Sequence, residues 1–274
     1  MNNNTAESSK KLEIQSTSHG AESGHWYNEG GLVLGIPSAK GDKLVKPTIR
    51  HARQGLVVPS VTTILNMFDK PALTQWKLKE YVKACSYIEP KGESESEDEY
   101  FARVQQQFNS HNDHAKIGTH VHAEIAKGLI GKPHDKIADH AISYVFSEYV
   151  KMINPVIKSE KPFANFGYGF GGTVDLILED TCNKIIIDFK TTDDDKLSQE
   201  SKLAYRDSHL AQLVAYKLGT HNGTNKNVRY INVFVGRLAG EIYVHEWDDP
   251  KDIEWSRLYF MLALGIFQHK NELK

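Results

Sequence analysis

The sequence predicts one α/β domain, describable also as α+β, in which helices flank a central mixed β-sheet and a largely helical part comes first. Three observations carry this prediction. Apolar residues recur at a helical spacing over much of 100–153. Strand-like segments follow over 163–190. The remaining residues show the pattern of a helix, two strands and a last helix. The order is therefore an α-rich part followed by β-β-β-α-β-β-α.

We expect the 274 residues to divide into a tail and one domain. Residues 1–24 are polar and lack the apolar core of a secretory signal, so they are expected to be a disordered tail. Residues 25–274 then form the domain, with a mainly helical part at 25–155 and the main sheet with its helices at 156–274.

Composition narrows the class of protein. No run approaches the roughly 18 apolar residues that a membrane helix needs, so no membrane association is expected. Cys85 and Cys182 lie outside any CxxC pattern, which argues against a disulfide scaffold, a zinc ribbon and an iron–sulfur cluster. The expected compartment is the reducing cytoplasm. The net charge of −2 is no signature of nucleic-acid binding, although a local groove can still be positive.

The N-terminal part is expected to start with a small β or irregular region at 25–60, because this stretch is rich in Gly and Pro with short apolar runs. Ser60 is placed to cap a helix that begins at Val61, and Pro71 suits the first turn of the next helix. The acidic stretch 91–99 is expected to be a solvated loop.

Two further helices precede the main sheet. Apolar residues recur every four positions from Ile117 to Leu129, and Gly131 is placed to end that helix. The next helix is expected over about 136–153.

The C-terminal part is expected to hold a helix over 203–219 and two strands over 228–238 and 241–247, joined by a tight turn. A last helix covers 250–270. Its periodicity marks one apolar stripe, made of Trp255, Leu258, Tyr259, Leu262 and Ile266.

The segment "GGTVDLILEDTCNKIIIDFKTT" at 171–192 predicts a β-hairpin about a turn at 180–183. If 171–179 pairs with 184–192, opposed residues have numbers that sum to 363, and Asp175 faces Asp188. The other face is wholly apolar. A slip of one residue would mix the two faces, so the register is self-supporting. The glycines before the hairpin suit close approach of another backbone.

In this register the Asp175 and Asp188 side chains start roughly 5 Å apart, and Lys190 emerges on the same face. Two close carboxylates repel each other unless a proton or a cation lies between them. Oxygen-rich ligation suits Mg²⁺ or Mn²⁺ better than Zn²⁺. The pattern thus indicates a divalent-metal site, and a solvated face with surface ion pairs is the alternative.

These residues resemble the Asp…(Asp/Glu)-x-Lys core of the PD-(D/E)XK nucleases, here Asp175 followed by Asp188-Phe189-Lys190. Two flanking motifs resemble the RecB-like exonuclease branch: Gly-Thr-x-x-His in "GTHVH" (118–122) and Gln-x-x-x-Tyr in "QLVAY" (212–216). "VPSVTTIL" and "DKPALTQW" are similar to the N-terminal text of phage-encoded and mitochondrial-genome-maintenance-type members. The motifs follow the family order over 58–236.

The resemblance implies a restriction-endonuclease-like core and a set of site residues. Lys190 would position or help to deprotonate the attacking water, or stabilise the transition state, and Gln212 and Tyr216 would orient the lysine or the phosphate. Glu160 fits a position where many members carry an acid, which binds metal directly or through water. One or two Mg²⁺ or Mn²⁺ ions would be held by His122, Asp175, Asp188, the backbone carbonyl of Phe189 and Glu160.

A second group of residues is expected near a groove that binds the nucleic-acid strand, because cationic and aromatic side chains suit phosphates and bases. The group consists of Trp76, Lys77, Lys202, Arg206 and His209.

The function that the resemblance implies is that of a divalent-metal-dependent DNA exonuclease, a hydrolase of phosphodiester bonds, so that 25–274 would be one nuclease domain. The N-terminal text suggests a phage or prophage protein that acts in recombination, replication or repair inside a bacterial host. Two alternatives stay open: a structure-specific endonuclease of the same superfamily, and a non-catalytic DNA-binding relative.

Overall fold

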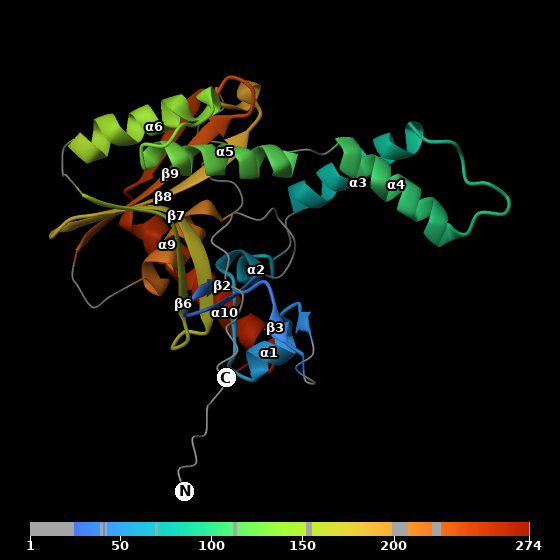
Figure 1. Cartoon of the computed structure of the whole chain (residues 1–274), viewed down its shortest axis with the longest axis horizontal. Helices are drawn as coiled ribbons and strands as arrows, with labels where there is room; N and C mark the ends of the chain where they lie inside the picture. Colours follow the sequence, from blue (N-terminus) through green and yellow to red (C-terminus); the bar gives the residue numbers. More distant parts are fainter. Residues whose placement is uncertain are drawn as a thin grey trace, which may run out of the picture.

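A computed structural model of the chain describes residues 25–38, 41, 43–68, 71–111, 114–151, 155–198, 208–220 and 226–273. It confirms a mixed α/β architecture with a five-stranded central sheet flanked by helices (Figure 1). Within the described part of the chain, no helix is long and apolar enough to cross a membrane.

The central sheet has the strand order β10-β9-β8-β7-β6. Strands β8 and β9 run parallel and the other neighbours run antiparallel. A parallel pair needs a crossover, and helix α9 (His209–Gly219) lies in it, ending at the expected glycine. The predicted element order is therefore confirmed. The strands are β6 (Val156–Asn165), β7 (Phe170–Glu179), β8 (Asn183–Thr192), β9 (Asn227–Gly236) and β10 (Ile242–Trp247).

Helices cover both faces of this sheet. Helices α5 (His114–Leu129) and α6 (Asp139–Val145) pack on one face, where they meet Ile185 and Ile187 of β8. Helices α2 (Val61–Leu65), α9 and α10 (Pro250–Lys270) pack on the other, where they meet Ile186. Since both faces of the β7–β8 hairpin are buried, the alternative of a solvated hairpin face is wrong.

The helix expected over 136–153 consists of three segments over 136–150, and residues 152–153 lie outside the described residues. A 3₁₀ turn (Lys136–Ala138) leads into α6, and a π-helical turn (Phe146–Val150) follows it. Beyond β8 a short 3₁₀ turn spans Asp194–Lys196. Of the helix expected over 203–219, residues 203–207 lie outside the described residues.

The region 25–60 is a small β region, as expected. A three-stranded sheet has the order β2-β1-β5, and a separate pair joins β3 to β4. The side chain of Ser60 accepts a hydrogen bond from the Thr63 N–H at 3.0 Å, which confirms the predicted cap of α2. The elements are β1 (Trp26–Asn28), β2 (Gly31–Leu32), β3 (Ile36–Pro37), β4 (Leu44–Val45), α1 (Ile49–Arg53) and β5 (Val58–Pro59).

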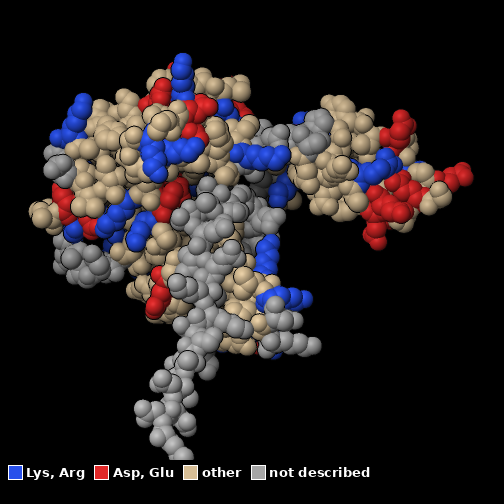
Figure 2. Space-filling model, in the orientation of Figure 1, with Lys and Arg blue, Asp and Glu red and all other residues tan. Residues whose placement is uncertain are grey.

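Helices α3 (Pro71–Ser86) and α4 (Glu97–His111) pack against each other and stand apart from the sheet (Figure 1). The Tyr81 and Phe108 rings stack with centroids 4.3 Å apart. Three residues of the expected acidic loop, 97–99, instead form the first turn of α4, where acidic side chains complement the helix dipole. Acidic side chains gather at the far end of this helix pair (Figure 2).

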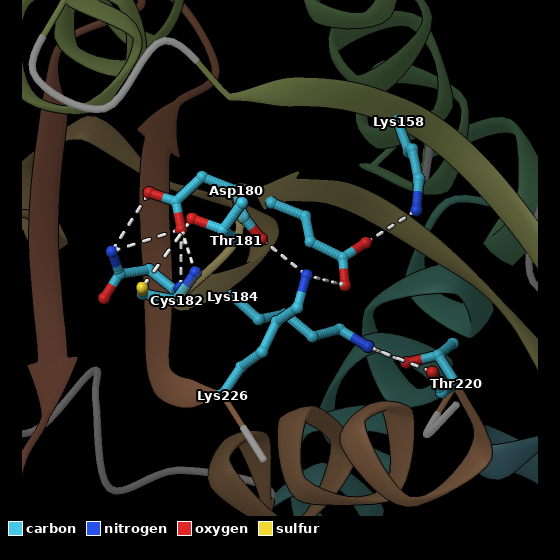
Figure 3. Close-up of polar contacts among 9 residues, drawn as sticks. Lys158, Asp180, Thr181, Cys182, Lys184, Thr220 and Lys226 are labelled. Carbon is cyan, nitrogen blue, oxygen red and sulfur yellow. Dashed lines mark hydrogen bonds and ion pairs between the residues drawn. The ribbon is translucent and has the colours of Figure 1, made fainter. Parts of the chain in front are cut away.

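The closed end of the β7–β8 hairpin is tied to α9. Buried Glu179 receives the ammonium groups of Lys158 and Lys226 at 2.6 and 3.0 Å (Figure 3). Lys184, whose pKa is lowered by burial, donates to the carbonyl and hydroxyl oxygens of Thr220, which follows α9. The Lys184–Thr220 contact ties the hairpin to the C-terminal end of α9, the helix that carries the Gln-x-x-x-Tyr motif.

The last helix is confirmed, but it does not bury the predicted stripe. Helix α10 packs on the sheet through Phe260, Ala263, Leu264 and Phe267. The five residues of the predicted stripe remain exposed. Apolar residues occur on both sides of this helix, so periodicity alone does not identify the side that faces the core.

Candidate active site

The site lies where β7 and β8 separate. Their ladder runs from Glu179–Lys184 to Leu176–Ile187, which confirms the register in which residue numbers sum to 363. The ladder stops there, one pair before Asp175 and Asp188, although pairing was predicted to continue to the end of both strands. Strand β8 instead follows β9 over its full length, and β7 follows β6. The two aspartates therefore lie at a fork in the sheet.

Asp175 bridges the fork with its side chain. Its Oδ2 accepts a hydrogen bond from the Phe189 N–H at 2.8 Å, in place of a strand-to-strand bond. The same oxygen lies 3.5 Å from Nδ1 of His122, a residue of α5, the helix that packs on this part of the sheet. Burial disfavours the ionised form of Asp175, but the charge and hydrogen bond of His122, the charge of Lys190 and the Phe189 N–H together lower the pKa of the carboxyl.

Helix α5 sits close to β8 at the Gly-Thr-x-x-His motif. A Cβ on Gly118 would lie 3.1 Å from Thr191 Oγ1, tighter than an ordinary van der Waals contact. The absence of a side chain at Gly118 lets α5 lie close to β8, and His122 lies one helical turn further along α5. Burial disfavours the imidazolium of His122, yet the Asp175 carboxylate raises its pKa overall.

Glu160 reaches the site through an irregularity in β6. The β6–β7 ladder includes Ser159–Leu176 and Lys161–Val174 but skips Glu160, whose φ is +47°. Such a conformation is unfavourable for a residue with a Cβ, and it tends to persist at functional sites. Ligand atoms of His122, Glu160 and Asp175 all lie within 4.8 Å of one another.

The electrostatics of this cluster favour a cation. Burial, and then the charge of Asp175, raise the pKa of Glu160 to about 7. Burial raises the pKa of Asp188 to about 6, with Lys190 opposing the shift and Asp175 adding to it. Carboxylates crowded in a dry place hold protons when nothing else neutralises them. Their oxygens, with one imidazole nitrogen, form a donor set that fits a hard divalent ion such as Mg²⁺ or Mn²⁺.

The predicted catalytic residues on β8 and α9 come together. Lys190 Nζ lies 2.7 Å from Asp188 Oδ2 and donates to Gln212 Oε1 at 3.0 Å. Gln212 in turn donates from Nε2 to the Tyr216 hydroxyl at 2.6 Å. Asp188 is only 1 % exposed. The Gln-x-x-x-Tyr motif thus holds the lysine from one side while Asp188 holds it from the other.

Sequence reasoning missed two residues of this network, Asn232 and Trp247. Asn232 lies on β9 in register with Asp188 and donates from Nδ2 to Asp188 Oδ2 at 3.0 Å. Its Oδ1 accepts the Trp247 indole N–H at 2.9 Å. The available signal was a lone asparagine inside the apolar run "YINVFV".

The glycines before the hairpin allow close approach, as predicted. A Cβ on Gly171 would lie 2.7 Å from both the Phe163 carbonyl oxygen and Tyr27 Cβ, so β1 and β6 can pack tightly over the start of β7. The Tyr27 hydroxyl also contacts Thr173 Oγ1 at 3.1 Å.

Three of the five expected nucleic-acid-binding residues, Trp76, Lys77 and His209, lie in the described part of the chain. Trp76 and Lys77 lie on α3, in the helix pair that stands apart from the sheet (Figure 1). His209 is the first residue of α9, with its ring 5.6 Å from that of Phe234. Lys202 and Arg206 lie outside the described residues.

Comparisons with known proteins bear on the fold of the site. The model of a family described as the PD-(D/E)XK nuclease superfamily matches residues 76–263. A search of curated proteins finds no match. Among solved structures, the alkaline exonuclease LHK-Exo from Laribacter hongkongensis is similar at 15 % identity over 55 % of this chain and 79 % of that one, with a TM-score of 0.34. A candidate exonuclease from Eubacterium rectale is similar at 13 % identity over 71 % and 69 %, with a TM-score of 0.35.

Proposed function

The chain belongs to the PD-(D/E)XK nuclease superfamily, and on that premise we propose that it is a divalent-metal-dependent exonuclease that hydrolyses phosphodiester bonds in DNA. One observation carries the proposal. Lys190 is held between the Asp188 carboxylate and Gln212, beside a cluster of His122, Glu160 and Asp175 whose ligand atoms lie within 4.8 Å of one another.

The residues that would hold Mg²⁺ or Mn²⁺ are His122, Glu160, Asp175, Asp188 and the carbonyl of Phe189. When bound, such an ion lowers the pKa of a water molecule and offsets the negative charge of the phosphate. Asp188 Oδ2 lies 2.7 Å from Lys190 Nζ and accepts a hydrogen bond from Asn232 Nδ2 at 3.0 Å, and these two contacts fix the orientation of the carboxylate that would help to hold the ion.

Lys190 would act on the phosphate and on the attacking water. An ammonium has three N–H donors, and in the described part of the chain two of them are directed at Asp188 and Gln212. The third can bind a phosphate oxygen or the water, where a fixed positive charge stabilises the transition state. Gln212, held by Tyr216, keeps the ammonium from swinging away.

The first test is nuclease activity of Asp188→Ala and Lys190→Ala with Mg²⁺ or Mn²⁺, on DNA labelled at either end. Loss of about a hundred-fold or more is expected for each variant, because Asp188→Ala removes a proposed metal ligand and Lys190→Ala removes the ammonium that would stabilise the transition state. Activity like that of the wild type in both variants would refute the mechanism.

The exonuclease proposal has its own test, because an endonuclease would use the same site. Closed circular single-stranded DNA should resist digestion while the same circle, once linearised, is degraded. Cleavage of the closed circle would identify an endonuclease, and metal-insensitive DNA binding without cleavage would identify a non-catalytic relative. The biological setting that we propose, DNA recombination, replication or repair by a phage protein in a bacterial cytoplasm, rests on the N-terminal motifs.

A further inference from the structure

Helix α10 exposes a continuous apolar stripe. Spacings of three and four residues place the stripe on one side of the helix, opposite the buried side. Exposed apolar surface of this extent commonly marks an interaction site. The exposed fractions are 70 % for Trp255, 44 % for Leu258, 37 % for Tyr259, 59 % for Leu262 and 41 % for Ile266.

Gly265 lies within this stripe, inside a helix of 21 residues. A glycine in a helix interior costs about 1 kcal/mol relative to alanine. A Cβ on Gly265 would meet no atom of the described residues within 4 Å, so that part of the chain offers no steric reason for a glycine here. Close approach of a second molecule would provide one.

We propose that this stripe is the contact surface between two copies of the chain, whose α10 helices pair antiparallel about a two-fold axis at Leu262. In that arrangement, residues whose numbers sum to about 524 lie at the same height along the two helices. Leu262 then meets Leu262 of the partner subunit. Leu258 enters the notch at Gly265 of the partner subunit, and Tyr259 lies beside Ile266 of the partner subunit.

Two charged residues beside the apolar stripe favour antiparallel pairing with a second copy of the chain. Asp252 and Lys270 are separated by 18 residues, which is five helical turns, so they lie on the same flank at opposite ends. Antiparallel pairing brings Asp252 beside Lys270 of the partner subunit and sets the helix dipoles against each other favourably. Parallel pairing would keep Asp252 and Lys270 at opposite ends of the helix pair, without this contact, and would set the two helix dipoles in the same direction.

The size of the surface indicates how strong the pair is. A helix of 21 residues spans about 32 Å, so contact along it lies at the small end of stable interfaces. We therefore expect a dimer that dissociates at roughly micromolar concentration.

Sedimentation equilibrium of the full chain across the micromolar range tests the pairing without using nuclease activity. The wild type should associate to twice the monomer mass. Leu262→Lys sets two ammonium groups together on the axis and should remain a monomer. The control is Leu238→Lys, which changes a leucine that is 86 % exposed in the β9–β10 turn and should still dimerise. A wild type that stays monomeric, or a dimer that tolerates Leu262→Lys, would overturn the proposal.

Charge reversal tests the direction of the pair and the identity of the partner. Asp252→Lys and Lys270→Asp should each weaken dimerisation by roughly three-fold or more, the scale of exposed ion pairs, and the double variant should restore it. Leu262→Cys, in a background with Cys85→Ser and Cys182→Ser, should form a disulfide between copies. A double variant weaker than both single variants would refute the antiparallel pairing. Because the readouts are mass and cross-linking, they are independent of the proposed nuclease function.

Discussion

The indole N–H of Trp247 donates to Asn232 Oδ1 at 2.9 Å, and this bond determines which way the Asn232 amide points. Trp can only donate, so the amide oxygen must face the indole and the NH₂ group must face Asp188. The carboxylate thereby has a fixed donor on Oδ2. A tryptophan on the edge strand β10 thus orients a carboxylate that belongs to the proposed metal centre.

Trp247→Phe should weaken metal binding while leaving the fold intact. The phenyl ring keeps most of the packing but removes the N–H, so Asn232 is free to rotate and Asp188 loses its fixed donor. Loss of such outer partners typically costs 10–100-fold in metal affinity or activity. The Mn²⁺ concentration for half-maximal cleavage should rise accordingly. Tyr243→Phe, on the same strand, is the matched control, and an unchanged Mn²⁺ dependence in Trp247→Phe would contradict this role.

The acid cluster should make metal-free stability fall as pH rises. The pKa of Glu160 is raised to about 7 and that of Asp188 to about 6, so the folded state holds protons that the unfolded state releases. Stability from these groups is present below their unfolded pKa values and is lost as pH rises through about 6 to about 7. Mg²⁺ should therefore raise Tm more at pH 8 than at pH 5.5. Glu160→Gln should reduce this difference, which differential scanning calorimetry can measure.

Replacing Glu160 by glycine should relieve the backbone strain at this position and so affect the stability of the fold. Its φ of +47° lies in the left-handed region, which glycine adopts without steric cost. Glu160→Gly should be more stable than Glu160→Ala by about 1 kcal/mol in urea unfolding, and both should lose metal affinity. Equal stability of the two variants would show that the backbone relaxes once the carboxylate is gone.

The contact between α5 and β8 should be sensitive to a single methyl group. Gly118→Ala places a Cβ about 3.1 Å from Thr191 Oγ1, which should push the helix and His122 away from Asp175. Activity should fall about ten-fold, a cost expected for a slightly misplaced group. Thr191→Ala removes the obstructing oxygen, so the double variant should recover most of the loss. A double variant as poor as Gly118→Ala would place the defect elsewhere.

The sequence was sufficient to predict the β7–β8 hairpin, its register and several of the residues that lie at the site. The alternation of β7 and β8 has period two, so a slip of one residue would bury Glu179 among the apolar side chains, and the observed ladder keeps the predicted register. The resemblance of the motifs to the PD-(D/E)XK nucleases also implied that His122, Lys190 and Gln212 would lie at one site. Their roles in catalysis remain predictions.

Other features depended on contacts between distant segments. The fork at Asp175 exists because β8 follows β9 while β7 follows β6, and no local pattern specifies that divergence. The register that places Asn232 beside Asp188 is a parallel one, reached through a crossover of more than thirty residues.

In helix α10, too, the sequence determined one feature and the tertiary structure decided another. Its sequence determined that a helix forms over 250–270, since apolar residues recur at a helical spacing and Asp249 caps its start. The tertiary structure alone decided that Phe260 and Leu264 face the sheet while Leu262 faces outward. The periodicity of a helix with two apolar sides satisfies either choice, and only the shape of the surface beneath it distinguishes them.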